Sequence, residues 1–347
     1  MGMARVGNPK DFWNTLKSIS ATEIAVEANL PLRIAIVGAK EDRDAVVQTL
    51  YSNKSTGKAL LTELREVQTA PPAQIGEFDG FSAEAAFPQT PDAFHLILDL
   101  GAERLQAPDG ALIYTLSDMG GLVPTLERLL EDKPEWQMAL ARNFPLLRKS
   151  VATRLINQTS VVNAEFALLT GITSAFPPTS VLLPVNALSD IVVLTKNQAM
   201  LALRLAAIYD LPVDYIKRSK ELAPILGNAF GWRAVAREIV GMIPFGGFVV
   251  KAMIAYAGTA TIGHAAQSYY ETGESLNREQ LKALYRNAYA ASRETVHKIA
   301  ERVKRGKHKG KGSEAPKANT LLKDKDVIEA ELLPLHKETT PRENEKE

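Results

Sequence analysis

The sequence predicts a mixed fold: a small α/β domain with a parallel sheet, then an all-helical domain and a disordered tail. Three observations predict this order. Short β-branched runs alternate with helical patterns over residues 31–144, as in parallel sheets covered by helices. Residues 145–305 show only helical spacing of apolar residues, interrupted at proline and glycine. Residues 306–347 are rich in charge, with a basic first half and an acidic second half.

The composition limits the classes of function. A chain of 347 residues is long enough for two domains with sizeable cores. Its 23% charged and 46% hydrophobic residues are typical of globular proteins. The net charge of +1 gives no overall attraction to nucleic acid, and we expect no such partner. The absence of cysteine excludes disulfides, thiolate metal sites and a cysteine nucleophile. No signal-peptide pattern opens the chain, so the expected location is cytoplasmic.

An amphipathic helix is predicted within residues 1–30. Asn8 is a suitable N-cap, and Pro9 suits the first helical position. The apolar residues Phe12, Leu16 and Ile19 follow at helical spacing, and either Glu23 or Val26 stands at the next position of this spacing. We expect the apolar face of this helix to pack on the α/β domain.

The α/β domain, residues 31–144, is expected to begin with a strand, a turn and a helix. Arg33–Gly38 is a β-branched run that ends in glycine, and residues 42–51 have a helical pattern. Two further buried strands are expected at 94–100 and 111–116, and a helix at 122–131. Residues 69–90 offer weak strands at best, because they are rich in Pro, Gly, Ala and Gln.

A strand that ends in glycine before a helix is where a phosphate loop, G-x-x-x-x-G-K-[ST], would lie. With Gly38 as the first glycine, Arg43 falls on the second glycine. Asp44 replaces the lysine and Ala45 replaces the hydroxyl that would bind Mg²⁺. A carboxylate at the lysine position repels phosphates, so the pattern indicates a GTPase-like sheet that has lost its catalytic loop.

Two more fragments resemble GTPase motifs. Thr115-Leu116-Ser117-Asp118 follows a predicted strand, as the guanine-reading [NT]-K-x-D does, but lacks the lysine. Asp118 also opens a D-x-x-G match. Gly38, Thr115 and Asp118 are therefore candidates for a vestigial nucleotide site, with no cofactor expected and GTP with Mg²⁺ as the alternative. The interpretation that we favour is that these residues cap strands and turns.

The helical domain, residues 145–305, is expected to contain helices near 145–175, 185–210, 214–226, 228–242, 245–272 and 277–305. Asn277 and Gln280 form a predicted capping box at the start of the last helix. One apolar stripe is expected along that helix: Leu281, Leu284, Tyr285, Ala288, Ile299 and Val303. Ala255, Thr259 and Gly263 stand four residues apart, a spacing that allows close helix packing.

Two stretches in this half are nearly free of charge. Residues 166–189 carry none, and Lys251 is the only full charge between 239 and 270. Prolines divide the first stretch, and Lys251 would cost about 2.5–3.5 kcal/mol at a bilayer midplane. Three interpretations stay open: integral insertion at the inner face of the plasma membrane, peripheral or protein-mediated contact with it, and a bundle buried in itself or in a homo-oligomer.

Several stretches resemble the YcjF-like family of bacterial helical domains of unknown function. They are NAEFALL at 163–169, LTKNQAMLALRLAAIYDLP at 194–212, GNAFGWRAVAREIVGMIPFGG at 227–247 and KAMIAYAGTATIGHAAQSYYETGE at 251–274. Domains of this family often lie behind or beside Era/TrmE-type small GTPase domains. The resemblance implies an all-helical module associated with membranes or membrane proteins, with no established reaction, and a degenerate GTPase-like domain before it.

Isolated polar residues in the apolar half are expected to form a buried network, with Asp190 or Glu221 paired to an arginine, rather than a lipid or ligand site. The residues concerned are Asp190, Gln198, Arg204, Glu221, Arg233 and Arg237. His264 is expected to be a core residue, and no metal site is predicted. The basic run Lys298–Lys311 has two open interpretations, contact with an anionic leaflet and a solvated tail.

The function that these features predict is non-catalytic. We expect a pseudo-GTPase with a helical, membrane-associated module that acts as a scaffold or adaptor at the cytoplasmic membrane face. Its expected partners are a membrane surface or membrane protein, a second copy of the chain, or a partner GTPase. Two alternatives stay open: a divergent GTPase whose missing groups come from a partner, and a soluble oligomeric structural protein.

Overall fold

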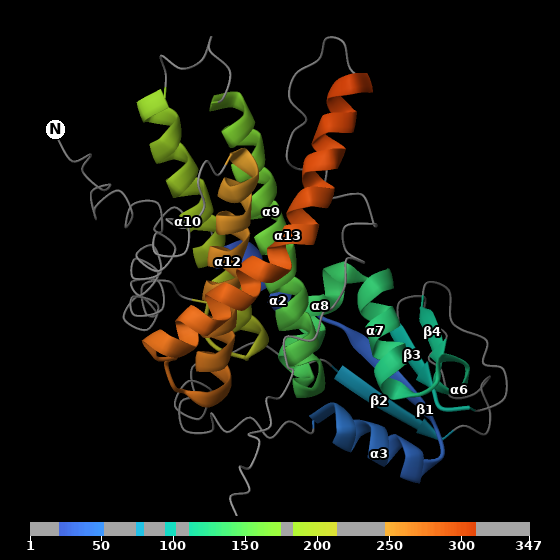
Figure 1. Cartoon of the computed structure of the whole chain (residues 1–347). Coiled ribbons are helices and arrows are strands. Elements are labelled where there is room, and N and C mark those ends of the chain that lie inside the picture. Colours follow the sequence, from blue (N-terminus) through green and yellow to red (C-terminus); the bar gives the residue numbers. More distant parts are fainter. Residues whose placement is uncertain are drawn as a thin grey trace, which may run out of the picture.

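The structure is a computed structural model that describes residues 21–51, 74–79, 94–101, 111–174, 183–213 and 247–309. Figure 1 shows a small sheet with its helices beside a group of long helices, so the chain has a mixed α/β and helical architecture. The start of the expected N-terminal helix, the helices expected at 214–226 and 228–242, and the tail from residue 310 lie outside the described residues.

The sheet has four parallel strands in the order β2-β1-β3-β4. The strands are β1 (Arg33–Gly38), β2 (Gln74–Asp79), β3 (Leu96–Asp99) and β4 (Leu112–Thr115). The parallel sheet and three of its strands are as predicted, and β2 lies inside the stretch expected to hold weak strands at best. Because β2 and β3 lie on opposite sides of β1, the strand order reverses between β1 and β3.

The two faces of the sheet bury alternate residues, as a strand period of two requires. Ile34, Ile36 and Leu98 belong to one continuous core that also includes the long helices. Val37 and Ile97 belong to a separate small cluster on the opposite face. Helices α3 (Lys40–Tyr51) and α7 (Leu122–Asp132) contribute their buried side chains to the large core, so one face of the sheet is continuous with the helical part of the chain.

Most of the other described residues form four long helices (Figure 1): α9 (Pro145–Ser174), α10 (Leu183–Ile208), α12 (Phe248–Thr272) and α13 (Arg278–Lys309). Helix α12 packs against the other three. A Cβ added to Gly263 would lie 2.6 Å from Ile156 Cγ1 and 3.1 Å from Leu201 Cδ2, so α12 approaches α9 and α10 closely at this residue. Thr259 and Ala255 are buried one and two turns earlier, which confirms the predicted close-packing positions.

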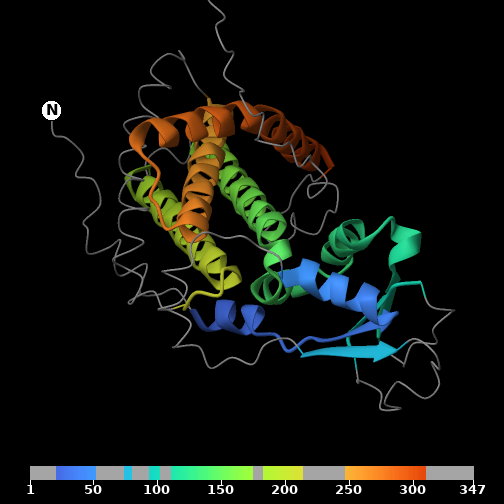
Figure 2. The ribbon, with the colours of Figure 1, turned by 90° about the horizontal axis from the view of Figure 1, so that it is seen from below.

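Helix α2 (Ala21–Ala28) packs on α10 and on α8 (Gln137–Asn143). The prediction that Val26 belongs to the apolar face is wrong, because Val26 is 63% exposed while Ile24 and Ala28 are fully buried. The expected docking on the α/β domain is correct for the contact with α8, which lies within residues 31–144, but α2 also packs on α10 of the helical half. Figure 2 shows α2 under the long helices, at the chain segment that leads into β1.

Helix α13 begins with the predicted capping box. The backbone N–H of Gln280 donates to Asn277 Oδ1 at 2.9 Å, and the backbone N–H of Asn277 donates to Gln280 Oε1 at 2.9 Å. Tyr285, Ala288 and Ile299 are buried, in agreement with the expected stripe. The helix continues to Lys309, so residues 306–309, which the composition assigned to the tail, are helical.

Within the described residues, no helix is both long and apolar enough to cross a membrane. The apolar side chains of α12 are instead buried against neighbouring helices over most of its length. Lys251, near its start, is exposed and donates a hydrogen bond from Nζ to Thr170 Oγ1 at 3.3 Å.

Candidate functional site

The carboxyl edge of the sheet is the candidate site. Ligands of open parallel sheets bind outside the carboxyl ends of the strands, where the strand order reverses. In the register of this sheet, Val37 lies opposite Asp99, and Asp99 lies opposite Thr115. Two of the predicted site residues, Gly38 and Thr115, are therefore at this edge. Asp118 lies in the short helix α6 (Leu116–Met119), which follows β4 directly.

The connection from β1 to α3 is too short for a phosphate loop. Ala39 alone separates Gly38, the last residue of β1, from Lys40, the first residue of α3. The positions aligned with the end of the loop motif, Asp44 and Ala45, are exposed residues of α3. A phosphate loop binds its ligand through several backbone N–H groups that are not bonded within a helix. The residues aligned with the loop, from Lys40 to Ala45, already belong to α3, so the chain lacks the loop that would surround a phosphate.

The side chains of Arg43 and Leu100 both contact Gly38 at the end of β1. The guanidinium of Arg43, a residue only 6% exposed, donates a hydrogen bond from Nη1 to the carbonyl oxygen of Gly38 at 2.8 Å. On the other side, Leu100 packs so closely that a Cβ at position 38 would lie 2.8 Å from Leu100 Cβ. The backbone N–H of Leu100 also donates to the carbonyl of Val37 at 2.9 Å. Glycine at position 38 is thus explained by close packing.

Asp99 is a buried carboxylate at the same edge, and it is only 3% exposed. Its Oδ2 accepts a hydrogen bond from Thr115 Oγ1 at 3.3 Å, and its Oδ1 accepts one from the backbone N–H of Gly101 at 3.1 Å. Asp99 therefore joins the end of β4 to the turn after β3. The sequence analysis missed this residue, although an acid at the end of the apolar run FHLILDL was a signal that could have identified it.

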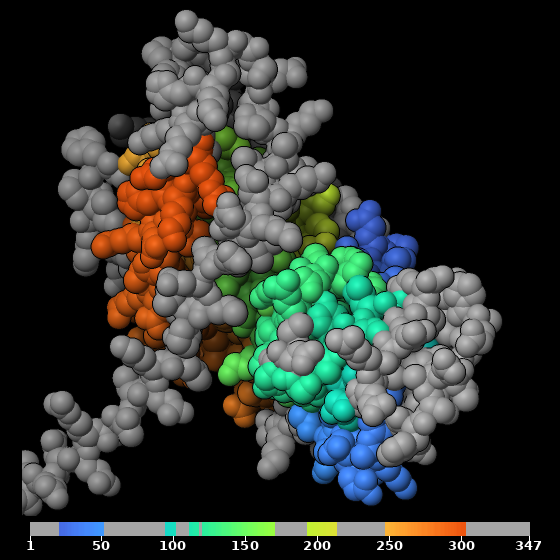
Figure 3. Space-filling view, turned by 90° about the vertical axis from the view of Figure 1, so that its right-hand side faces the viewer, coloured from blue at the N-terminus to red at the C-terminus, as the bar shows by residue number. Residues whose placement is uncertain are grey.

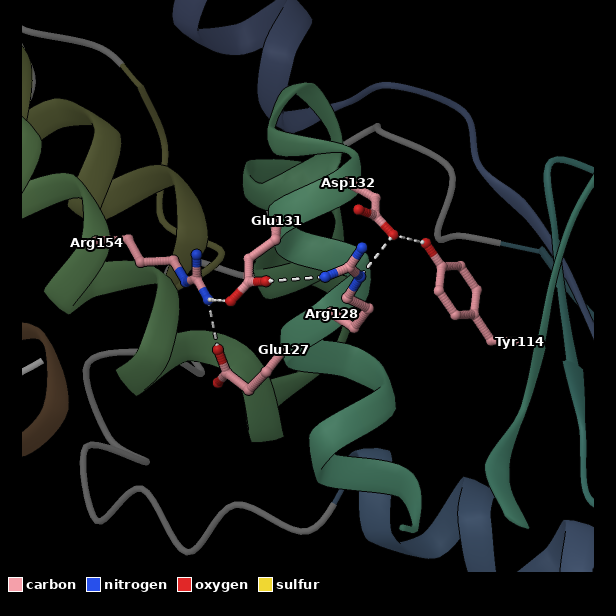
Figure 4. Close-up of polar contacts among 6 residues, drawn as sticks. All are labelled: Tyr114, Glu127, Arg128, Glu131, Asp132 and Arg154. Atoms are coloured by element: carbon pink, nitrogen blue, oxygen red, sulfur yellow. Dashed lines mark hydrogen bonds and ion pairs between the residues drawn. The ribbon is translucent and has the colours of Figure 1, made fainter. Parts of the chain in front are cut away.

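Helix α7 connects the sheet to α9 through a chain of polar contacts (Figure 4). On the sheet side, Tyr114 of β4 donates its hydroxyl proton to Asp132 Oδ2 at 2.7 Å. Arg128 Nε donates to the same oxygen at 3.2 Å. Burial raises the pKa of Tyr114 to about 12, and the hydrogen bond to the Asp132 carboxylate contributes to this increase. Tyr114 is therefore protonated, and is a donor, at neutral pH.

On the bundle side of α7, Arg154 of α9 lies between two carboxylates (Figure 4). Its Nη2 is 2.7 Å from Glu127 Oε2 and 3.7 Å from Glu131 Oε1, and its side chain is only 11% exposed. Ser150, one turn earlier on α9, donates to Glu127 Oε1 at 2.6 Å. These contacts fix α7 on α9, and α7 in turn holds the sheet through Tyr114.

An uncharged polar network lies in the middle of the helical half. Asn163 Nδ2 of α9 donates to Thr259 Oγ1 of α12 at 2.8 Å, and Gln198 Nε2 of α10 donates to the same oxygen at 3.2 Å. Asn197 Nδ2 donates to Asn163 Oδ1 at 2.7 Å. The network therefore joins three helices through buried amides and one hydroxyl. The sequence analysis named Gln198 but expected an ionic network, with Asp190 or Glu221 paired to an arginine; it missed Asn163 and Thr259, which form the centre of this uncharged network.

The other polar residues named from the sequence are placed as follows. Arg204 Nη2 lies 3.5 Å from Glu27 Oε1 of α2, and the two residues form a partly exposed ion pair. The side chain of Asp190 and residues Glu221, Arg233 and Arg237 lie outside the described part of the chain. His264 is half-buried, and desolvation lowers its pKa against the opposing effects of Gln267 and Glu271. The described residues include no group of three or more His, Cys, Asp or Glu that could hold a metal ion.

Comparisons of the chain with family models, with curated proteins and with solved structures find no match.

Proposed function

We propose that this chain is a non-catalytic scaffold or adaptor: a pseudo-GTPase α/β unit joined to a helical module that associates with the cytoplasmic face of the plasma membrane. The observation that carries the non-catalytic half is the hydrogen bond from Arg43 to the carbonyl of Gly38. Arg43 aligns with the second glycine of the loop motif, but it is a buried residue of α3 that binds the end of β1.

The energetics of this contact support a structural role. Arg43 is buried, and its removal from the Gly38 carbonyl would leave a charged group without that bond in a dry environment, at a cost of about 1.5–3 kcal/mol. Leu100 occupies the other side of Gly38. The edge of the sheet thus serves to order the turns after β1, β3 and β4.

The polar contacts of α7 support the scaffold half. A sheet that performs no chemistry can still position a helical module, provided that the two are firmly joined. Arg154, Glu127 and Ser150 supply charge-assisted hydrogen bonds between α7 and α9, and Tyr114 joins α7 to the sheet. The partner that we propose for the helical module is a membrane surface or a membrane protein.

Fluorescent GDP and GTP, titrated with Mg²⁺ into the full chain, test the non-catalytic half. We expect no saturable binding by the wild-type protein. Saturable binding that is lost in Thr115→Val, and kept in the exposed control Thr49→Val, would favour a divergent GTPase instead.

Cell fractionation tests the membrane half. We expect the chain in the membrane pellet, with release by high salt if the contact is peripheral and release only by detergent if it is integral. A chain found wholly in the soluble fraction would contradict membrane association and favour an oligomeric structural protein.

A further inference from the structure

We propose that the exposed face of α13 is an electrostatic docking surface for an anionic lipid bilayer. The inference rests on the proposed membrane association and names the surface that makes it. Helix α13 carries ten Lys or Arg residues against three Glu, the highest basic density of any described helix. Its 32 residues extend over about 48 Å at the α-helical rise.

Basic residues of α13 contribute to its exposed surface. Arg286, Arg293 and His297 follow one another at intervals of seven and four residues, which keeps them on one face. The basic stripe consists of these three residues with Arg278 toward the start of the helix and Lys298 toward its end, all of them exposed. The buried residues Tyr285, Ala288 and Ile299 lie on another face, so the side chains of Arg286, Arg293 and His297 are directed away from the core. In Figure 3 the atoms of α13 form part of the molecular surface.

The charges at the middle of the stripe are available to a partner. Arg286 and Arg293 are exposed and form no ion pair with another described residue. Two of the three glutamates of α13 form ion pairs within the helix: Glu279 Oε1 lies 3.6 Å from Lys282 Nζ, and Glu294 Oε1 lies 2.7 Å from Lys298 Nζ. Beyond Arg302 the helix adds four more basic residues: Lys304, Arg305, Lys307 and Lys309.

The form of the stripe favours a lipid surface over a protein or a nucleic acid. Protein interfaces depend on apolar and aromatic anchors, and none of the large exposed hydrophobic residues of the described chain lies on α13. Single-stranded nucleic acid is bound by aromatic residues that stack on bases. Tyr289, the nearest aromatic residue, is half-buried and stacks on Tyr285 instead. Exposed basic side chains without apolar or aromatic anchors suit the electrostatic field of an anionic leaflet.

Vesicle co-sedimentation of the full chain tests the proposal. The probes are vesicles of equal parts phosphatidylcholine and phosphatidylglycerol, and vesicles of phosphatidylcholine alone, at about 0.1 M and about 1 M salt. We expect binding to the anionic vesicles at low salt only. Arg286→Gln with Arg293→Gln should lower the partition coefficient at least about tenfold, because each basic residue at the surface contributes roughly fivefold.

The matched control is Lys40→Gln with Lys149→Gln, which makes the same change in net charge at exposed residues of α3 and α9. This control should bind as the wild-type protein does. Equal loss in the two double variants, absence of binding to anionic vesicles, or equal binding to phosphatidylcholine alone would overturn the proposal. Binding to an acidic polypeptide or to single-stranded DNA, without binding to vesicles, would also overturn it and assign the stripe to that partner. None of these results depends on nucleotide binding, so failure here is distinct from failure of the pseudo-GTPase assignment.

Discussion

Asn163 and Thr259 are 96 residues apart in the sequence, and both are fully buried; the amide of Asn163 donates to the Thr259 hydroxyl at 2.8 Å. The same hydroxyl accepts from Gln198 and donates to the carbonyl of Ala255 at 2.8 Å. One side chain therefore satisfies groups on three helices. Buried polar groups that are fully hydrogen-bonded specify one arrangement of a core, because any shift in register leaves them unsatisfied.

Thr259→Val tests this network. Valine keeps the shape of threonine but removes the hydroxyl, so the buried amides of Asn163 and Gln198 lose their shared acceptor. We expect the free energy of unfolding to fall by about 2–3 kcal/mol, as for other unsatisfied buried donors. Thr259→Ser keeps the hydroxyl and should lose about 1 kcal/mol, for the missing methyl group. Urea unfolding measures both, and equal losses would contradict the network.

Gly263→Ala tests the close approach of α12 to α9. Alanine favours a helix over glycine by about 1 kcal/mol, but the new Cβ would lie 2.6 Å from Ile156 Cγ1, inside a packed core. Overpacking of this kind costs about 1–3 kcal/mol, so we expect a net loss of up to about 2 kcal/mol. Gly247→Ala, where nothing lies within 4 Å, is the control; Gly247 is the N-cap of α12, so this change should cost only the preference of that position for glycine, less than about 1 kcal/mol. A stabilised Gly263→Ala would show that the helices are further apart.

Glu165 should give the stability of the protein a pH dependence. It lies on α9, is 7% exposed, and burial raises its pKa to about 7 from an ordinary value of 4.5, against the opposing charge of Arg302. The folded state therefore binds this proton more tightly than the unfolded state does. Its contribution to stability is fully present below pH 4.5 and is lost as the pH rises through about 7. The loss amounts to at most about 3 kcal/mol.

Urea unfolding at a series of pH values measures this effect. Glu165→Gln should remove the decrease and should be more stable than the wild-type protein at pH values above about 7. Glu274→Gln changes an exposed carboxyl and should leave the pH profile unaltered. A wild-type profile that rises over the same pH range, after subtraction of the Glu165→Gln profile, would contradict the burial of this group.

The ion pair between Arg154 of α9 and Glu127 of α7 should contribute to the free energy of unfolding. A double-mutant cycle with Arg154→Met and Glu127→Gln measures the pair, whose nitrogen and oxygen are 2.7 Å apart at a site where Arg154 is 11% exposed. We expect a coupling energy of about 1–2 kcal/mol. A matched cycle tests Arg128 and Glu131, whose Nη1 and Oε2 atoms are 3.9 Å apart and whose side chains are both more than half exposed. Its coupling energy should be less than about 0.5 kcal/mol. Equal coupling in the two cycles would show that burial of Arg154 adds nothing.

The sequence predicted best the features that depend on neighbouring residues. The apolar run Arg33–Gly38 is β1 to the residue, and the Asn277–Gln280 capping box opens α13 as expected. Strand β2 was expected only weakly, since residues 69–90 are rich in Pro, Gly, Ala and Gln, and it is a strand because β1 pairs with it. Here tertiary pairing overrides a low β-propensity.

The candidate site was predictable only in part. Gly38 and Thr115 could be placed at the carboxyl edge because parallel strands end together. The role of Arg43 could not be read from a motif alignment, because the alignment assumes a loop where the chain already forms a helix. Asn163 and Thr259 carry no local signal that pairs them, since their contact depends on how α9 and α12 pack.

The most direct test of the account is the thermal unfolding of the full chain with and without GTP or GDP and Mg²⁺. The account predicts an unchanged unfolding temperature at millimolar nucleotide, for the wild-type protein and for Arg43→Ala alike, because Leu100 and the one-residue connection leave no phosphate loop. A ligand present at about 100 times its Kd stabilises a protein by about 2.7 kcal/mol, which raises the unfolding temperature by several degrees. Such a rise in the wild-type protein, dependent on Mg²⁺, would contradict the central claim and assign nucleotide chemistry to the sheet.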